Sequence, residues 1–231
     1  MKKLTVDFST PIVANKTYPP LQLVEGSMPY SLTNAVIPGT SKKAIRHELR
    51  QTDPAVQFGS YRAEMTVMNN NSNPDANTPW LSFCTFIKSG ELNTGSKEVI
   101  FPFQFHDRSK TRGTGIASPS LAIEIMNGRY RVRIRYSVGD YHTSGNRRDV
   151  APIDLGPVVL DTLQTWLVYY VPHITAGKIR IWLNGAAESK PSFSYDGPCQ
   201  FDGSQHPFLK MGIYGWNRPP LVGHKAVYLI T

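Results

Sequence analysis

Apolar and polar residues alternate along many short segments of the chain, and Gly, Pro, Asn and Asp separate these segments. In residues 131–135, arginine occupies every second position, and Val132 and Ile134 lie between. Successive side chains of a β-strand point to opposite faces, so one face of this segment is basic and the other is apolar. Ten segments of this kind are predicted to be strands: Ala44–Gln51, Ser60–Met68, Trp80–Ile87, Val99–Phe105, Leu121–Met126, Tyr130–Tyr136, Thr165–Pro172, Lys178–Leu183, Phe208–Tyr214 and Ala226–Ile230.

Ten or more short strands in 231 residues predict an all-β fold of two packed antiparallel sheets. All-β sandwiches of this length are commonly single domains, and the sequence has no internal repeat, so one domain is expected over residues 1–231. The polar segments Asn69–Asn77 and Thr143–Asp149 are predicted to be exposed loops. Asn184-Gly185, after the predicted strand Lys178–Leu183, is a strong hairpin signal.

The formal net charge of +8 favours a polyanionic partner, which could be nucleic acid, anionic lipid or an acidic glycan. The sequence contains no apolar run long enough to cross a membrane, so no membrane partner is expected. It also contains no recognisable nucleic-acid-binding motif, so no nucleic acid is expected either. An acidic polysaccharide is therefore the favoured partner.

The two cysteines, Cys84 and Cys199, match no metal-ligand spacing and are expected to be buried thiols, with a long-range disulfide left open. Asp7 and Pro11 interrupt the apolar start of the sequence, so no cleavable signal peptide is evident. The location is left open. A protein whose partner is an acidic polysaccharide is expected to meet it outside cells, either as a secreted protein or carried by a phage or virus.

The first group of candidate functional residues lies in the predicted strand Ala44–Gln51. Arg46, Glu48 and Arg50 project to one face of this strand, whereas His47 projects to the other face and is expected to lie in the core. A zinc-protease motif on a helix would need a histidine where the chain has Gln51, so a metal site is rejected.

Two further groups lie in the predicted strands Val99–Phe105 and Phe208–Tyr214. Gln104 and His106 share one face, and an imidazole is the most frequent general base. Lys210, Gly212 and Tyr214 also share one face, where Gly212 is expected to leave room for a ligand to approach the backbone.

These residue types suit the β-elimination of a uronic-acid polysaccharide. An enzyme must neutralise the sugar carboxylate, remove the proton at C5 and protonate the leaving oxygen at C4. Arg50 and Gln104 suit the first task, His106 or Tyr214 the second, and Tyr214 the third. Lys210 is expected to hold an acidic sugar and to lower the pKa of Tyr214 through its charge. This scheme requires no metal or cofactor.

Three motifs of the sequence resemble alginate lyases and heparin lyase I-like polysaccharide lyases. They are R-x-E-L-R at Arg46–Arg50, Q-x-H at Gln104–His106 and F-x-K-x-G-x-Y at Phe208–Tyr214, and the segment Trp166–Gly185 is similar to the heparin lyase-like version. The resemblance spans about residues 40–217. It implies a concanavalin A-like β-jelly roll whose concave sheet binds substrate, with Gln104, His106 and Tyr214 catalytic beside Arg50.

The resemblance also leaves points open. Alginate lyases continue Tyr-Asn-Gln where this chain has Tyr214-Gly215-Trp216-Asn217, so glucuronan, alginate and heparin-like polymers all remain candidate substrates. No cofactor is implied, structural calcium is left as an option, and a monomer is expected. The predicted substrate-binding residues are Arg46, Glu48, Lys210, Arg131, Arg133, Arg135 and Asn217.

Three alternatives remain. A noncatalytic lectin-like module could use the same fold. A glycoside hydrolase would need two facing carboxylates, for which Glu48, Glu64 and Glu124 are candidates. A nucleic-acid-binding protein could use the arginines of residues 131–135.

Overall fold

The computed structural model describes residues 21–56, 59–67, 80–109, 119–141, 143, 145–215, 221–223 and 225–230. Within these residues the chain forms two antiparallel seven-stranded sheets. In spatial order, sheet A consists of β1 (Leu21–Gly26), β4 (Tyr61–Val67), β13 (Ser204–Gly215), β6 (Ile100–Ser109), β7 (Pro119–Met126), β8 (Arg129–Ser137) and β9 (Arg147–Pro157). Sheet B consists of β12 (Phe193–Gly197), β11 (Gly177–Leu183), β10 (Gln164–Val171), β5 (Trp80–Phe86), β14 (Lys225–Ile230), β3 (Lys43–Arg50) and β2 (Leu32–Val36).

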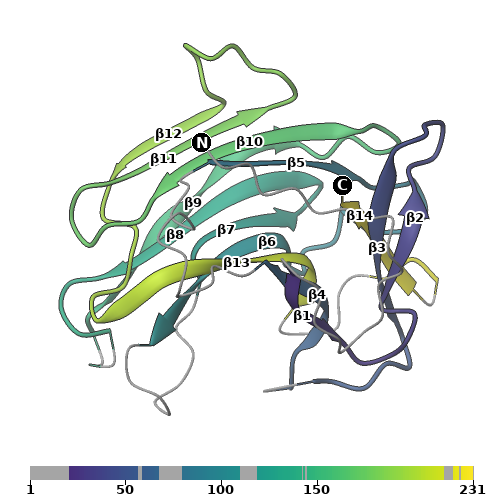
Figure 1. Ribbon diagram of the computed structural model, residues 1–231, viewed down its shortest axis with the longest axis horizontal. Coiled ribbons are helices and arrows are strands. Elements are labelled where there is room, and N and C mark those ends of the chain that lie inside the picture. Colours follow the sequence, from purple (N-terminus) through teal and green to yellow (C-terminus); the bar gives the residue numbers. More distant parts are fainter. Residues whose placement is uncertain are drawn as a thin grey trace.

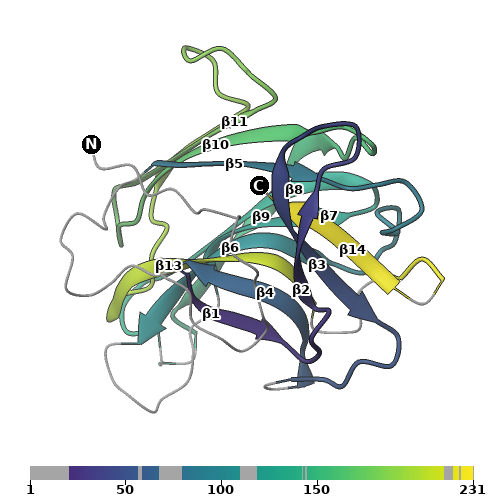
Figure 2. The ribbon, with the colours of Figure 1, turned by 45° about the vertical axis from the view of Figure 1, so that its right-hand side comes forward.

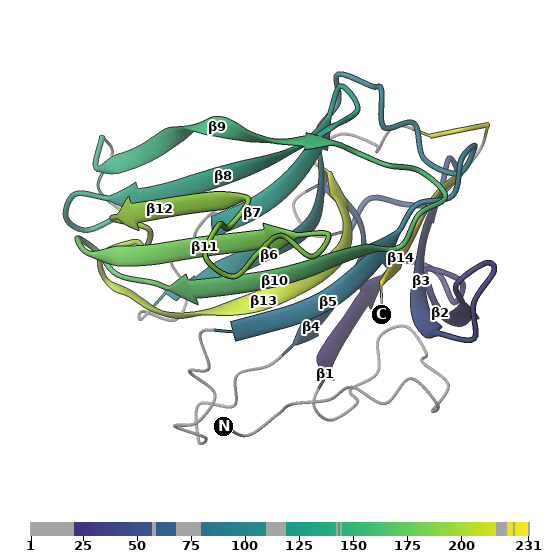
Figure 3. The same cartoon turned by 90° about the horizontal axis from the view of Figure 1, so that it is seen from above.

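The two sheets stack as layers (Figures 1 and 3). Sheet A arches, most visibly along β13, so that its outer face, turned away from sheet B, is concave (Figure 1). Strands β2, β3 and β14 stand together at one end of the molecule (Figure 2). The expected all-β fold of two packed antiparallel sheets is confirmed.

All ten predicted strands occur in the structure, which adds β1, β2, β9 and β12. These four additional strands are the edges of the two sheets. Part of the predicted loop Thr143–Asp149 belongs to β9, which begins at Arg147, so that prediction is corrected. An edge strand that is mostly exposed lacks a clear apolar alternation, which explains the error. The predicted loop Asn69–Asn77 lies outside the described residues.

Two Asn-Gly turns adopt positive φ at both residues, as a type I′ turn requires. Asn184-Gly185 forms the expected turn after β11, and the amide of Ala186 donates to the carbonyl of Leu183 across it. The tight hairpin, however, is at Asn127-Gly128, where Met126 of β7 pairs directly with Arg129 of β8.

The core between the sheets is centred on Trp166, which is 2% exposed. Its ring lies parallel to Phe83 of sheet B and meets Phe103 and Tyr130 of sheet A edge to face. The indole nitrogen donates to the hydroxyl of Thr85 at 2.9 Å. Aromatic side chains of both sheets therefore fix how the layers stack.

Both cysteines are free thiols: Cys199 is buried and Cys84 is partly exposed.

The described part of the chain contains no helix that could cross a membrane. The described residues also contain no cluster of three or more His, Cys, Asp or Glu side chains that could hold a metal ion.

Candidate active site

Most of the predicted catalytic residues meet on the outer face of sheet A, where β4, β13 and β6 are neighbours. Along β13, Leu209, Met211 and Ile213 are buried in the core, so Lys210 and Tyr214 point outward. The register places Lys210 opposite Gln104, Phe208 opposite His106 and Tyr214 opposite Arg62. Gln104 and His106 of β6 therefore share one face with Lys210 and Tyr214 of the adjacent strand β13, as alternation predicts.

Glu64 lies at the centre of this cluster and is 0% exposed. One of its carboxylate oxygens accepts a hydrogen bond from the amide nitrogen of Gln104 at 2.8 Å. The other lies 3.9 Å from the ammonium nitrogen of Lys210 and 4.0 Å from a guanidinium nitrogen of Arg62. The carboxylate therefore orients the amide of Gln104 and compensates two buried cations.

His106 is held as a neutral imidazole. Its ring stacks on Phe208 at a centroid distance of 5.7 Å. Burial, together with the charges of Lys210, Arg62 and Arg135, lowers the pKa of His106 to about 3. At neutral pH the imidazole is therefore unprotonated, which is the state in which an imidazole accepts a proton.

Tyr214 is held in the protonated form. Burial raises its pKa, and the charge of Glu64 adds to this rise, whereas Arg62 and Arg135 oppose it. The expectation that Lys210 lowers the pKa of Tyr214 is therefore corrected, because burial outweighs the cations. A phenol that keeps its proton at neutral pH suits a proton donor.

The predicted arginine row of β8 lies on the same outer face, because Val132 and Ile134 between these arginines are fully buried. Arg131 and Arg133 both pair with the buried carboxylate of Glu124, at 2.6 and 2.8 Å. Arg135 pairs with Asp149 of β9 at 2.6 Å. These carboxylates compensate part of the positive charge of the arginine row. The row lies beside the cluster around Glu64, because the charge of Arg135 lowers the pKa of His106.

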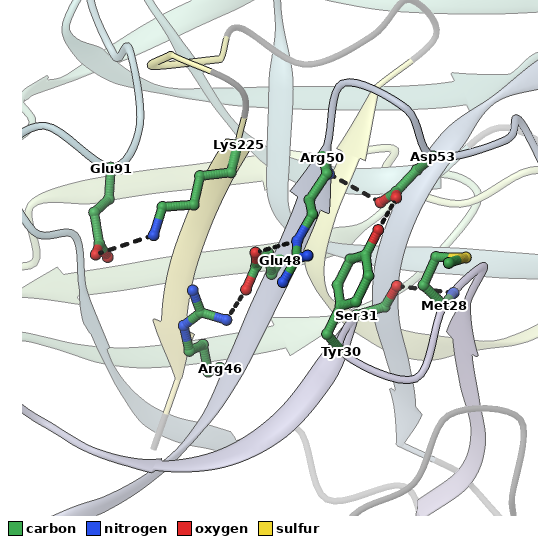
Figure 4. A network of polar contacts seen from close by, with 9 residues as sticks. All are labelled: Met28, Tyr30, Ser31, Arg46, Glu48, Arg50, Asp53, Glu91 and Lys225. Carbon is green, nitrogen blue, oxygen red and sulfur yellow. Dashed lines mark hydrogen bonds and ion pairs between the residues drawn. The ribbon is translucent and has the colours of Figure 1, made fainter.

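Arg46, Glu48 and Arg50 do not belong to this cluster. Strand β3 lies in sheet B between β14 and β2, and the three side chains point away from sheet A. The carboxylate of Glu48 is held between the two arginines, and the guanidinium of Arg50 lies 3.6 Å above the ring of Tyr30 (Figure 4). Asp53 accepts from the hydroxyl of Tyr30, closing a network on the outer surface of sheet B (Figure 4). The expectation that Arg50 neutralises substrate beside Gln104 is corrected by this placement.

His47 points to the interior, as alternation predicts, and is 0% exposed. Its Nδ1 lies 2.9 Å from the carbonyl oxygen of Ala63 in β4 and donates to it, which leaves Nε2 as the unprotonated nitrogen. Gly212 of β13 is adjacent, because a Cβ at this position would lie 2.7 Å from His47 Nδ1. Glycine at this position thus leaves room for the imidazole of His47 and the backbone of β4.

The buried His47 predicts a loss of stability in acid. Burial lowers its pKa to about 4, below its value of 6.5 in an unfolded chain. Between these values the unfolded chain binds a proton that the folded chain excludes, so stability falls as the pH decreases from 6.5 to 4. At 1.36 kcal/mol per pH unit, His47 alone contributes about 3 kcal/mol to this loss.

Denaturant unfolding at pH 7 and near pH 4.5 measures this effect in the wild type and in His47→Asn, whose amide retains a donor for Ala63. The wild type is expected to lose more free energy of unfolding between the two pH values than the variant. Equal losses would contradict the assignment of a buried neutral imidazole.

Two residues of the cluster, Arg62 and Glu64, have no role in the elimination that the sequence predicts, and Glu64 is a candidate only under the glycoside hydrolase alternative. Their R-x-E spacing repeats that of Arg46 and Glu48 one strand earlier, and the only signal that separates the two pairs is which strand lies beside β13.

The predicted substrate residue Asn217 lies outside the described residues.

Several solved structures share the fold of this chain. An endo-β-1,4-glucuronan lyase from the fungus Trichoderma reesei superposes with a TM-score of 0.67 at 16% identity, over 96% of this chain and 94% of that chain. An alginate lyase from Pseudomonas aeruginosa gives 0.51 at 14% identity, over 98% and 99%. The catalytic domain of a glycoside hydrolase family 131 protein from Coprinopsis cinerea gives 0.51 at 13% identity, over 90% and 78%.

At these identities the likenesses show the fold, a jelly roll, and the neighbours include both lyases and a hydrolase. No curated protein matched the chain at a significant level. A family model described as "Polysaccharide lyase" matches residues 23–229, a span from β1 to β14. The chain therefore belongs to the polysaccharide lyase family.

Proposed function

We propose that this polysaccharide lyase cleaves a uronic-acid polymer by β-elimination on the outer face of sheet A. The observation that carries the proposal is the meeting of Gln104, His106, Lys210 and Tyr214 on the adjacent strands β6 and β13. Within this cluster, the pKa of His106 is lowered and that of Tyr214 is raised. Surroundings that move two titratable groups apart in this way separate a base from an acid.

Neutralisation of the sugar carboxylate is the first requirement, because the C5 proton is not acidic enough beside a fully charged carboxylate. Arg62 and Lys210 supply positive charge on this face, and the amide of Gln104 is held by Glu64. Donors fixed in place before the reaction stabilise the enolate-like charge that develops at the carboxylate. We assign this role to Arg62, Gln104 and Lys210.

Proton transfer follows from the states of His106 and Tyr214. The neutral imidazole of His106 accepts the C5 proton, and the electrons of that bond form the C4–C5 double bond. As the bond from C4 to the glycosidic oxygen breaks, Tyr214 donates its phenolic proton to that oxygen. Exchange with water then returns the proton from the imidazolium to the phenolate.

The arginine row of β8 extends the acid-binding surface beyond the reacting sugar. Among the described residues, the ion pairs of this face involve six cations (Arg62, Lys210, Arg129, Arg131, Arg133 and Arg135) and four carboxylates (Glu64, Glu124, Asp149 and Asp154). Guanidinium groups bind carboxylate and sulfate groups in a bidentate manner. An acidic polymer lying across β13, β6, β7 and β8 would meet this excess of positive charge.

Glucuronan is the polymer that we expect to be cleaved best, ahead of alginate and heparin-like chains. The likeness to a glucuronan lyase, with the TM-score of 0.67 given above, supports this order. The expectation that no metal or cofactor takes part also belongs to this proposal, because the cations and amide on this face suffice for neutralisation. A monomer without nucleic-acid or membrane partners remains a prediction.

Substitution of Arg62 tests the proposal against its counterpart on sheet B. Arg62→Ala is expected to lower kcat/KM on a uronate polymer about 100-fold, because it removes a cation from the face where the carboxylate is neutralised. Arg50→Ala is expected to leave kcat/KM within about threefold, because Arg50 is half-exposed and lies on the far sheet, away from the reacting sugar. Both constants come from formation of the unsaturated product.

A carboxyl-reduced form of the same polymer serves as the substrate control. It has no carboxylate to neutralise and no acidic C5 proton, so no unsaturated product is expected from it. A larger loss for Arg50→Ala than for Arg62→Ala would contradict the proposed site. Binding of every polymer without any unsaturated product would favour the lectin-like alternative.

A further inference from the structure

A second carbohydrate-binding candidate lies on the opposite side of the molecule, on the outer face of sheet B. Along β10, Trp166, Val168 and Tyr170 are buried in the core, so Leu167 and Tyr169 point outward. On the neighbouring strands, Trp80 of β5 pairs with Tyr169, and Trp182 of β11 pairs with Leu167. Trp80, Leu167 and Tyr169 thus share a surface that the proposed active site does not use, and Trp182, which is only 8% exposed, packs against Trp80 from β11.

The aromatic rings of this surface contact one another. Trp80 stacks on Trp182 at a centroid distance of 5.6 Å and an interplanar angle of 27°, and its centroid lies 4.7 Å from that of Tyr169. Trp80 and Leu167 remain 39% and 37% exposed, although they lie in contact with other apolar groups. Single exposed apolar residues are common, whereas here exposed apolar side chains adjoin one another and are held in place by the buried ring of Trp182.

The polar residues at the border of this surface favour an anionic, hydroxyl-rich occupant. Arg180 of β11 lies opposite Tyr169, and one nitrogen of its guanidinium is 2.8 Å from each carboxylate oxygen of Asp196. Lys178, two residues earlier, is exposed and forms no ion pair within the described part of the chain. The negative charge at this border is thus compensated, and one cation is left over.

We infer that the aromatic platform formed by Trp80, Leu167, Tyr169 and Trp182 binds a segment of acidic polysaccharide outside the active site. The apolar face of a sugar ring would lie on Trp80 and Tyr169. Its hydroxyl and carboxylate groups would meet Arg180, Asp196 and Lys178. The platform would hold polymer near the enzyme and raise its local concentration at the active face. This inference rests on the proposed uronate substrate for the identity of its occupant.

Affinity electrophoresis tests the platform with the Tyr214→Phe background, in which the polymer stays intact. Native gels contain glucuronan, alginate or heparin, and mobility gives the dissociation constant for each polymer. Trp80→Ala is expected to weaken binding of the preferred polymer about tenfold, the effect of losing one aromatic anchor. Trp80→Phe is expected to retain most of the affinity. Val36→Ala, which truncates another exposed residue of sheet B, is expected to bind like the parent.

Cleavage assays with an otherwise wild-type chain separate the platform from the active site. Trp80→Ala is expected to cleave short oligosaccharides at the wild-type rate but to lose activity on dilute long polymer. Equal mobility of the parent and Trp80→Ala in every polymer gel would overturn the inference. If Trp80→Ala instead converts a dimer to a monomer without changing polymer binding, the surface is a contact between two copies of this chain.

The outcomes also separate this inference from the proposed function. Binding that depends on Trp80, without unsaturated product from any polymer, would sustain the platform and remove the proposed reaction. Unsaturated product, together with polymer binding that does not depend on Trp80, would sustain the proposed reaction and remove the platform.

Discussion

Tyr214→Phe is expected to lower kcat on the preferred uronate polymer about 100- to 10,000-fold with little change in KM, because it removes the proton donor for the leaving oxygen. Burial raises the pKa of Tyr214, so the wild-type phenol carries this proton at neutral pH. The ring itself would remain in place. It contacts Phe101 at a centroid distance of 5.8 Å and lies 5.0 Å from the guanidinium carbon of Arg62, and phenylalanine preserves both contacts.

Tyr169→Phe is the matched control, because Tyr169 lies on the outer face of sheet B and the substitution also removes one hydroxyl. This variant is expected to cleave short oligosaccharides at the wild-type rate. Steady-state kinetics of unsaturated product formation gives kcat and KM for both variants. A Tyr214→Phe enzyme that retains most of its kcat would contradict the assignment of Tyr214 as the acid.

Gly212→Ala is expected to have the largest effect on stability, a loss of about 3–5 kcal/mol from the free energy of unfolding. A Cβ at this position would lie 2.2 Å from the carbonyl oxygen of Ala63 and 2.9 Å from Cα of Glu64. Both atoms belong to the backbone of β4, which cannot move without disturbing its pairing with β13. The φ of Gly212 is +137°, which adds backbone strain for any other residue.

Gly128→Ala is the matched control for the effect of a positive φ. Gly128 has φ of +71°, but nothing lies within 4 Å of a Cβ built there. Its substitution is expected to cost about 1 kcal/mol, the effect of the backbone alone. Denaturant unfolding of the two variants measures the difference. Equal losses would show that β4 and His47 do not close around Gly212 as the structure describes.

Alternation along the chain predicted the strands that are covered by neighbours but missed the edges. The ten predicted segments correspond to strands that pair on both sides within their sheets, whereas β1, β2, β9 and β12 pair on one side only. In β9, residues 147–149 are exposed, and Pro152 interrupts the apolar pattern. Edge strands expose much of their surface to solvent, so their sequences carry little of the burial signal on which the prediction depends.

The face of each candidate residue could be predicted, but the neighbours of each strand could not. Alternation correctly placed Gln104 beside His106 and Lys210 beside Tyr214, and the structure joins these pairs because β6 adjoins β13. The same reasoning placed Arg46 and Glu48 on one face without showing that this face belongs to sheet B. Strand pairing is set by contacts distant in sequence, which a local pattern does not contain.

Burial was the second quantity that the sequence did not contain. The charge of a nearby lysine suggested a lowered pKa for Tyr214, yet burial raises it. Burial also makes His106 and His47 neutral, and the pKa of each is lowered far below the ordinary value of histidine. Such shifts depend on the depth of a side chain beneath its neighbours, which only the packed structure defines.

Counting the products of one digestion distinguishes elimination from hydrolysis and from binding alone. Wild-type protein is incubated with glucuronan, and new reducing ends and new C4–C5 double bonds are measured in the same sample. We predict one double bond for each new reducing end, because every β-elimination creates both. New reducing ends without double bonds would show hydrolysis and would contradict the assigned roles of His106 and Tyr214.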